Sequence, residues 1–145
     1  ILAKMGVEHF IDPNDEQWLE KVKALTYEGQ GVDYCIDGSG HPFYQEKCLQ
    51  ATVPYGKINF SGHIPGQSFA MKNLDHIIDP GNTLMGQHDV NARDRETLVR
   101  MLCNPQVQKN IDAMVTHVFP MSKAGEAFEV QVSKQCGKIF MRPWE

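Results

Sequence analysis

The fold of this chain is decided by residues 31–40, which read Gly31-Val32-Asp33-Tyr34-Cys35-Ile36-Asp37-Gly38-Ser39-Gly40. A short run rich in β-branched and aromatic residues ends in a glycine-containing turn, which is typical of a buried strand followed by a loop. Pro42 suits the first turn of the helix that comes next, because the missing N–H of proline is not needed there. The stretch therefore predicts a strand over 32–36 and then a helix whose core-facing residues are Phe43, Cys48, Leu49 and Ala51.

The same alternation of strands and helices is predicted on both sides of this stretch. Asn14 is placed to cap a helix, with Gln17 at its third position, and one face of that helix is made by Trp18, Leu19, Val22 and Leu25. Further strands are predicted at Val7–Ile11, Lys57–Ser61, Thr83–Gly86 and Gly137–Met141, and further helices around Leu98–Cys103, Val107–Val115 and Ala124–Phe128. Strands this apolar have no solvent-facing side, so the alternation predicts an α/β domain with a parallel sheet.

The composition is that of a soluble globular domain. The chain has 145 residues, of which 41% are hydrophobic and 22% charged, and its net charge is -4. The slight acidity argues against binding to nucleic acid or anionic lipid. No apolar run approaches the roughly 18 residues of a membrane helix, and no signal peptide opens the chain. The four cysteines form no C-x-x-C pair, so we expect buried, reduced thiols and a cytoplasmic protein.

Small residues follow three of the predicted strands. These stretches are Gly38-Ser39-Gly40, Ser61-Gly62-His63 and Gly86-Gln87-His88. In parallel sheets ligands bind beyond the carboxyl ends of the strands, where small residues let a ligand approach the backbone. Glycine after a strand is also ordinary turn chemistry. The pattern therefore leaves a binding site and plain turns as open alternatives.

Catalytic motifs are incomplete or absent. Gly38-Ser39-Gly40 opens a G-x-G-x-x-G phosphate loop, but Phe43 stands where the third glycine is needed for close helix packing. The six histidines include no pair at i and i+4, and no G-x-S-x-G nucleophile elbow occurs. The residues alone predict neither a catalytic centre nor a metal site within this chain.

The order of these pieces resembles the C-terminal portion of the medium-chain dehydrogenase/reductases, the family of zinc-type alcohol, polyol and threonine dehydrogenases. The resemblance lies in the order and spacing of several short stretches that together cover nearly the whole chain. These stretches are Ala3–Val7, Phe10–Asp12, Gly31–Gly40, Gly56–Gly62, Val115–Met121, Lys123–Phe128 and Gly137–Phe140.

The resemblance implies a partial Rossmann (NAD(P)-binding) parallel sheet with flanking helices, which lacks the first βαβ unit. It implies a dinucleotide-binding part over 1–90, and over 91–145 the helices and strand that return to the catalytic domain in relatives. It also implies the cofactor-binding residues. The adenine end would lie beside Gly38, Ser39, Gly40 and His41, the nicotinamide half beside Ser61, Gly62 and His63, the carboxamide beside Gln87 and His88, and the pyrophosphate near Lys138.

The implied function is that of a fragment of an alcohol, polyol or threonine-type dehydrogenase. The intact enzyme would move hydride between a carbon of a small alcohol and NAD or NADP, a choice that this chain leaves open. Zinc would be bound by the missing N-terminal domain, and the isolated chain would be inactive. The alternatives are a zinc-free member similar to quinone reductases, a non-catalytic nucleotide-binding or assembly module, and a fragment with no role of its own.

The implied gap in the sheet has a physical consequence. Without the two central strands of the Rossmann order, Val7–Ile11 and Val32–Ile36 would each have an unpaired edge, or would pair with each other. Unpaired edges and uncovered apolar faces favour association, so we expect a homodimer or a higher oligomer. The strand at Thr83–Gly86, which pairs across the two-fold axis in dimeric relatives, offers a second route to assembly.

Overall fold

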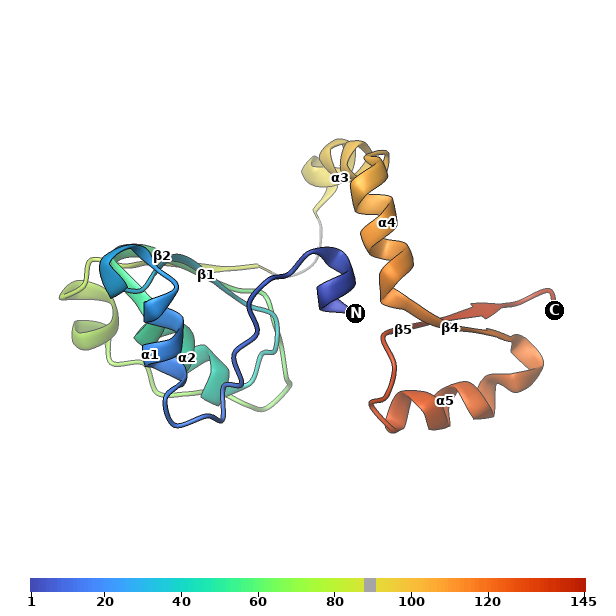
Figure 1. Ribbon diagram of the computed structural model, residues 1–145, viewed down its shortest axis with the longest axis horizontal. Coiled ribbons are helices and arrows are strands. Elements are labelled where there is room, and N and C mark those ends of the chain that lie inside the picture. Colours follow the sequence, from blue (N-terminus) through green and yellow to red (C-terminus); the bar gives the residue numbers. More distant parts are fainter. Residues whose placement is uncertain (88–90) are drawn as a thin grey trace. The chain divides into compact units, whose positions relative to one another are not determined.

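The computed structural model describes residues 1–87 and 91–145, which divide into two compact units (Figure 1). The sheet unit is Ile11–Asp89. The C-terminal unit combines Ile1–Phe10 with Val90–Glu145.

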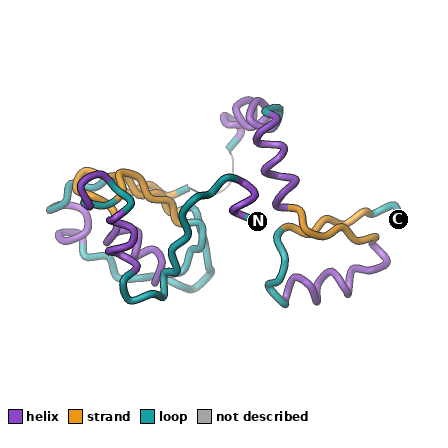
Figure 2. Tube along the Cα trace, viewed as in Figure 1, coloured by secondary structure: helices purple, strands orange, loops and turns teal. Residues whose placement is uncertain are grey.

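The sheet unit is built on three parallel strands. They are β1 (Val32–Asp37), β2 (Thr52–Phe60) and β3 (Thr83–Gly86), in the order β1-β2-β3. Asp37 is paired with Phe60, and Phe60 with Gly86, so the three strands end side by side. The predicted parallel α/β sheet is confirmed, and Figure 2 shows its strands in orange.

Two helices cover one side of this sheet. Helix α2 (Pro42–Ala51) packs on β1 and β2, and α1 (Trp18–Ala24) packs on α2, as Figure 1 shows. The core is small, and its centre is the fully buried Ile58 of β2. Leu49 and Ala51 are buried as predicted, and Cys48 is half-buried.

The expectation that Phe43 faces the core is wrong. Its side chain is 44% exposed. The helical repeat places Tyr44, Cys48 and Ala51 in one row that borders an apolar groove, and Phe43 is one residue out of that row. Its ring lies instead beside Lys47, whose ammonium nitrogen is 4.6 Å from the ring centroid.

The predicted start of α1 is also wrong, because two aspartates organise the chain before it. The Asp12 carboxylate accepts the Asn14 N–H at 2.9 Å, and the Asp15 carboxylate accepts the Gln17 N–H at 2.8 Å. Aspartate side chains compete in this way for N–H groups two residues on. Asn14 therefore lies in a turn rather than at the helix cap, and the helix begins only at Trp18.

The predicted strand at Val7–Ile11 does not form. The segment has neither helical nor strand structure, and Val7 and Phe10 are exposed. A strand needs a neighbour to bind its N–H and C=O groups, and among the described residues neither sheet includes this segment. The expected pairing of Val7–Ile11 with Val32–Ile36 is therefore absent from the described structure.

The C-terminal unit contains three helices and a two-stranded parallel sheet. Its helices are α3 (Arg95–Leu102), α4 (Pro105–Met114) and α5 (Ala124–Val132), and its strands are β4 (Val115–Pro120) and β5 (Lys138–Arg142). The helices and β5 were predicted, but β4 was not, because it follows α4 without a loop. Short helical turns occur at Leu2–Met5, Tyr27–Gly29, Leu74–Ile78, Ala92–Asp94 and Met121–Lys123.

The four cysteines are free thiols, but the expectation that they are buried holds only in part. Cys35, Cys48 and Cys136 are half-buried. Cys103 is exposed, because it follows the last residue of α3 at the surface. No helix in the described ranges is long and apolar enough to cross a membrane.

Candidate site at the carboxyl edge of the sheet

The candidate site is the edge at which the three strands of the sheet unit end. The turn after β1 holds Gly38, Ser39, Gly40 and His41, the turn after β2 holds Ser61, Gly62 and His63, and Gln87 follows β3. The parallel register brings these residues to the same edge, as the sequence predicted for strand ends. His88 lies outside the described residues. Lys138 belongs to the C-terminal unit, where it begins β5 beside Val115.

The carboxylate of Asp37 organises the first turn. Asp37 is only 3% exposed. Its Oδ1 accepts the Ser39 N–H at 2.9 Å and the Ser39 hydroxyl at 2.6 Å, and its Oδ2 accepts the Gly40 N–H at 3.0 Å and the Gln45 amide at 3.2 Å. Burial by itself raises the pKa of Asp37, but these hydrogen bonds outweigh it and hold the pKa below its ordinary value.

The backbone carbonyl of Asp37 joins the first turn to the second. It accepts the N–H groups of Ser61 and Gly62, both at 2.9 Å. One residue at the end of β1 therefore fixes two turns, one through its side chain and the other through its main chain. Sequence reasoning did not single out Asp37 as a site residue. The available signal was an aspartate at a strand end before Gly-Ser-Gly, a position where aspartate accepts N–H groups from the residues that follow.

Gly40 and Gly62 are required because the two turns touch through their backbones. A Cβ on Gly62 would overlap the Gly40 nitrogen, and a Cβ on Gly40, whose φ is +69°, would overlap the His63 nitrogen. Gly38 differs, because a Cβ there would meet nothing within 4 Å. The sequence left a binding site and plain turns as open explanations for these glycines. Turn geometry explains Gly40 and Gly62, whereas it does not require Gly38, which faces open space.

The other residues of the edge are fixed by short-range hydrogen bonds. The Nδ1 atom of His41 accepts the Phe43 N–H at 3.2 Å, so His41 caps α2. The Gln87 N–H donates to the Phe60 carbonyl at 3.1 Å, and the Asn59 amide donates to Gln87 Oε1 at 3.3 Å. These bonds tie the end of β3 to the end of β2.

The edge is not built to hold a phosphate group. The N–H groups of Ser39, Gly40, Ser61 and Gly62 donate to Asp37, and that of His41 donates to the Ser39 hydroxyl at 3.1 Å. A phosphate cradle needs N–H groups that point out at the ligand. These five N–H groups are directed into the protein. The structure therefore agrees with the incomplete G-x-G-x-x-G pattern, which also argues against a phosphate-binding loop.

The described residues do not form a metal centre. Among residues 1–87 and 91–145, no three His, Cys, Asp or Glu side chains lie together in a way that could hold a metal ion. A zinc ion therefore does not fit the described residues of this chain.

Comparison with known proteins identifies the family. Residues 1–104 match the family model described as zinc-binding dehydrogenase. The chain belongs to the zinc-binding dehydrogenase family. The predicted resemblance is thereby confirmed.

Similar proteins include dehydrogenases much longer than this chain. It is 32% identical over 142 residues to the L-threonine 3-dehydrogenase of Pyrococcus furiosus, covering 96% of this chain and 39% of that protein. It is 25% identical over 140 residues to the L-threonine 3-dehydrogenase of Caldanaerobacter subterraneus, covering 97% of this chain and 40% of that enzyme. The chain thus spans about two-fifths of the length of these relatives.

Solved structures show the same fold. The chain resembles benzyl alcohol dehydrogenase from Acinetobacter calcoaceticus with a TM-score of 0.78 and 19% identity, over 97% of this chain and 38% of that one. It resembles an alcohol dehydrogenase from Thermotoga maritima with a TM-score of 0.74 and 18% identity, over 88% and 34% of the two chains. The predicted fold class, a partial Rossmann-type sheet, is therefore confirmed.

Removing the charge of Asp37 should weaken the sheet unit in a pH-dependent way. We expect Asp37→Asn to cost about 1–3 kcal/mol of unfolding free energy at neutral pH, because the carboxylate is buried and accepts four hydrogen bonds. The folded-state pKa lies below the unfolded value of about 3.9, so this stabilisation is present above that pH and is lost as the pH falls through the folded-state pKa.

The measurement is urea denaturation followed by Trp18 fluorescence, in a Trp144→Phe background so that only the sheet unit reports. The midpoints of wild type and Asp37→Asn should converge as the pH is lowered from 7 towards about 3. Asp33→Asn, an exposed position on the same strand, is the control and should leave the midpoint unchanged. A constant difference across the pH range would contradict the assigned role of the Asp37 charge.

Because the two turns touch, an alanine substitution should cost much more stability at one glycine of this edge than at another. Gly62→Ala should cost about 3 kcal/mol or more, because its Cβ overlaps backbone atoms that have no room to move. Gly38→Ala should change stability by no more than about 0.5 kcal/mol, because its Cβ enters open space. The same Trp18 denaturation experiment measures both, and equal losses would show that the turns are not packed as described.

Proposed function

We propose that this chain provides part of the nicotinamide-dinucleotide site of a longer dehydrogenase that oxidises a small alcohol, such as a threonine-type or polyol substrate. The observation that carries the proposal is the common edge of three parallel strands, formed by the turns 38–41 and 61–63 together with Gln87. Family membership and the relatives named as threonine and alcohol dehydrogenases support it. In this proposal residues 1–90 serve the cofactor, and residues 91–145 return to the catalytic domain.

The residues of the edge would contact the two ring systems of the cofactor. When bound, the dinucleotide supplies the chemistry by accepting or returning a hydride at its nicotinamide ring. The turn 38–41, open at Gly38, would lie beside the adenine end, and Ser61-Gly62-His63 and Gln87 would line the nicotinamide half. His88 would add contacts near the carboxamide, and Lys138 would face the pyrophosphate. The inward-directed N–H groups support this assignment, since they suit flat uncharged rings better than phosphates.

The remaining parts of the enzyme would come from elsewhere in the longer protein. We place the zinc ligands, the main phosphate loop and the residue that selects NAD or NADP outside this chain, because the described residues contain no fitting metal ligands and the G-x-G-x-x-G pattern is incomplete. The isolated chain would therefore not oxidise alcohols. A zinc-free member of the superfamily stays compatible with this account. A reducing cytoplasm suits the four free thiols.

Amide chemical shifts measured by NMR test the site directly. Titrating the labelled chain with NAD should shift the amides of 38–41, 61–63 and 87 with a Kd on the order of millimolar, since phosphate binding is weak here. AMP should shift mainly the turn 38–41, and nicotinamide mononucleotide mainly 61–63. Gly125, which lies in α5 of the C-terminal unit, is the internal reference and should not respond.

A variant tests whether the AMP-induced shifts come from binding at the turn 38–41. Gly38→Val should remove the AMP-induced shifts while leaving the Trp18 unfolding midpoint near that of wild type, because the side chain fills only the open outer side of the turn. Shifts confined to other parts of the chain would contradict the proposed site. Micromolar affinity for the dinucleotide would also contradict it, because it would require a phosphate cradle within this chain.

We further propose that the chain self-associates. Among the described residues the outer edge of β1 is unpaired, and Ile36 on that strand is 61% exposed. An unpaired apolar edge strand is a template for pairing with another chain. Light scattering at micromolar concentration should give a homodimer or a higher oligomer, and Ile36→Lys should reduce the mass, because a charge on an edge strand opposes pairing. A monodisperse wild-type monomer would refute self-association.

A further inference from the structure

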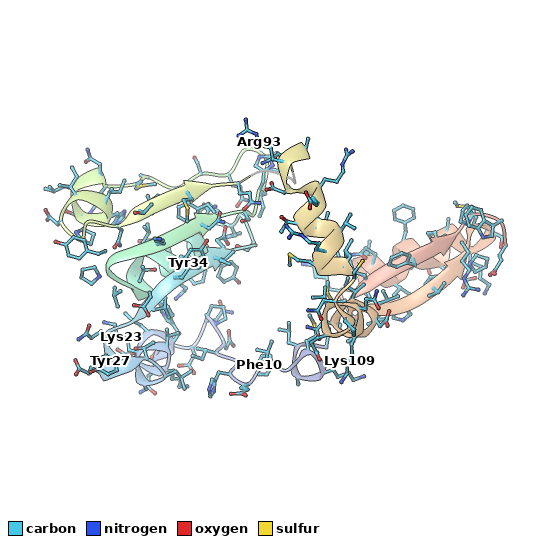
Figure 3. The ribbon with its side chains drawn as sticks, turned by 90° about the horizontal axis from the view of Figure 1, so that it is seen from above. Phe10, Lys23, Tyr27, Tyr34, Arg93 and Lys109 are labelled. Carbon is cyan, nitrogen blue, oxygen red and sulfur yellow. The ribbon has the colours of Figure 1, made fainter. Side chains whose placement is uncertain are left out.

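Two cysteines of the sheet unit face the same apolar groove. Cys35 comes from β1 and Cys48 from α2, and these two elements pack against each other. The groove has a volume of about 340 Å³ and is lined mainly by apolar side chains, among them Trp18 and Ile36. Tyr34, labelled in Figure 3, also lies on β1 and borders this groove.

The two thiol groups interact with each other. A hydrogen-bond interaction between the Cys35 and Cys48 side chains is the largest influence on the pKa of each thiol. Both residues are half-buried and line the groove, so a small molecule that enters the groove comes next to the pair. The pair therefore combines proximity, which a disulfide requires, with access for a small oxidant.

The contact makes the two sulfur atoms unequal. The hydrogen bond from the Cys48 thiol stabilises a Cys35 thiolate and lowers the pKa of Cys35, although burial and the charge of Asp37 act in the opposite direction. The same hydrogen bond, burial and the thiolate charge on Cys35 raise the pKa of Cys48. The thiolate is the nucleophilic form of cysteine, so Cys35 is suited to attack and Cys48 to resolve.

We propose that Cys35 and Cys48 form a reversible disulfide when a peroxide enters the groove. The Cys35 thiolate attacks one peroxide oxygen and breaks the O–O bond, which gives a sulfenic acid and, with hydrogen peroxide, a hydroxide that becomes water with the proton released when the Cys35 thiol ionised. Cys48 then attacks the Cys35 sulfur, the S–S bond forms, and the sulfenic oxygen leaves as a second water with the thiol proton. The two sulfurs are oxidised by two electrons in all, and the peroxide is reduced by the same two. A dithiol reverses the change by thiol–disulfide exchange.

The disulfide would connect the helix to the strand around the candidate site. The chain between the two cysteines runs through Asp37 and the turn 38–41. A bond between Cys35 and Cys48 closes this segment into a loop and fixes α2 to β1. The other two cysteines lack this arrangement, since the Cys136 thiol donates to the Val130 carbonyl at 3.6 Å and Cys103 is exposed after α3.

The test uses the full chain in a Cys103→Ser, Cys136→Ser background, so that only the pair remains. After treatment with hydrogen peroxide at low protein concentration, both thiols should disappear together. The intact mass should fall by the mass of two hydrogen atoms, without an interchain product on a non-reducing gel. Dithiothreitol should restore both thiols. The matched control is Cys35→Ser, Cys48→Ser with the other two cysteines retained, which should form no intrachain disulfide.

Single variants distinguish the attacking residue from the resolving one. Cys48→Ser should stop at a Cys35 sulfenic acid that dimedone traps, whereas Cys35→Ser should react with peroxide at least about tenfold more slowly. Differential alkylation of the wild-type chain gives the same information without a substitution, which covers a variant that fails to fold. Peroxide treatment that leaves both thiols intact, joins separate chains, or overoxidises one cysteine without a Cys35–Cys48 bond would overturn the proposal.

Discussion

The buried carboxylate of Asp37 is the interaction on which the candidate site depends. Its side chain accepts four hydrogen bonds within the first turn and α2, and its carbonyl accepts two from the second turn. A buried charge is costly unless hydrogen bonds compensate it, so the turn must stay folded around this carboxylate. The strand end, the cap region of α2 and the turn after β2 are thereby held as one edge.

The chemistry of the edge follows from that arrangement. Because Asp37 takes the N–H groups of Ser39, Gly40, Ser61 and Gly62, those groups are not directed at a ligand. Gly40 and Gly62 allow the two turns to touch through their backbones. These small residues therefore serve the packing of one turn against the other. What is offered outward is a surface without directed donors from these positions, and this is the basis of the proposal that it takes the ring systems of a dinucleotide and not its phosphates.

The sequence predicted the structure correctly where a segment's own strand or helix preference agrees with its packing in the fold. The run Val32–Ile36, the proline at the start of α2 and the strand at Thr83–Gly86 predicted the sheet and the common edge at which its strands end. It was misleading at Val7–Ile11, where residues that favour strands pair with no strand of the described structure. It also missed β4, which follows α4 without a turn signal. The central role of Asp37 was hidden because it depends on Ser61 and Gly62, which are distant in sequence.

The most direct test of the account is a crystal structure of this chain within the proposed longer dehydrogenase, solved with a nicotinamide dinucleotide bound. We expect the adenine ring beside the turn 38–41 and the nicotinamide ring beside 61–63, with Asp37 still accepting the N–H groups of Ser39 and Gly40. The pyrophosphate should lie on another segment. A pyrophosphate bound by the N–H groups of Ser39 and Gly40, with Asp37 displaced from them, would contradict the account.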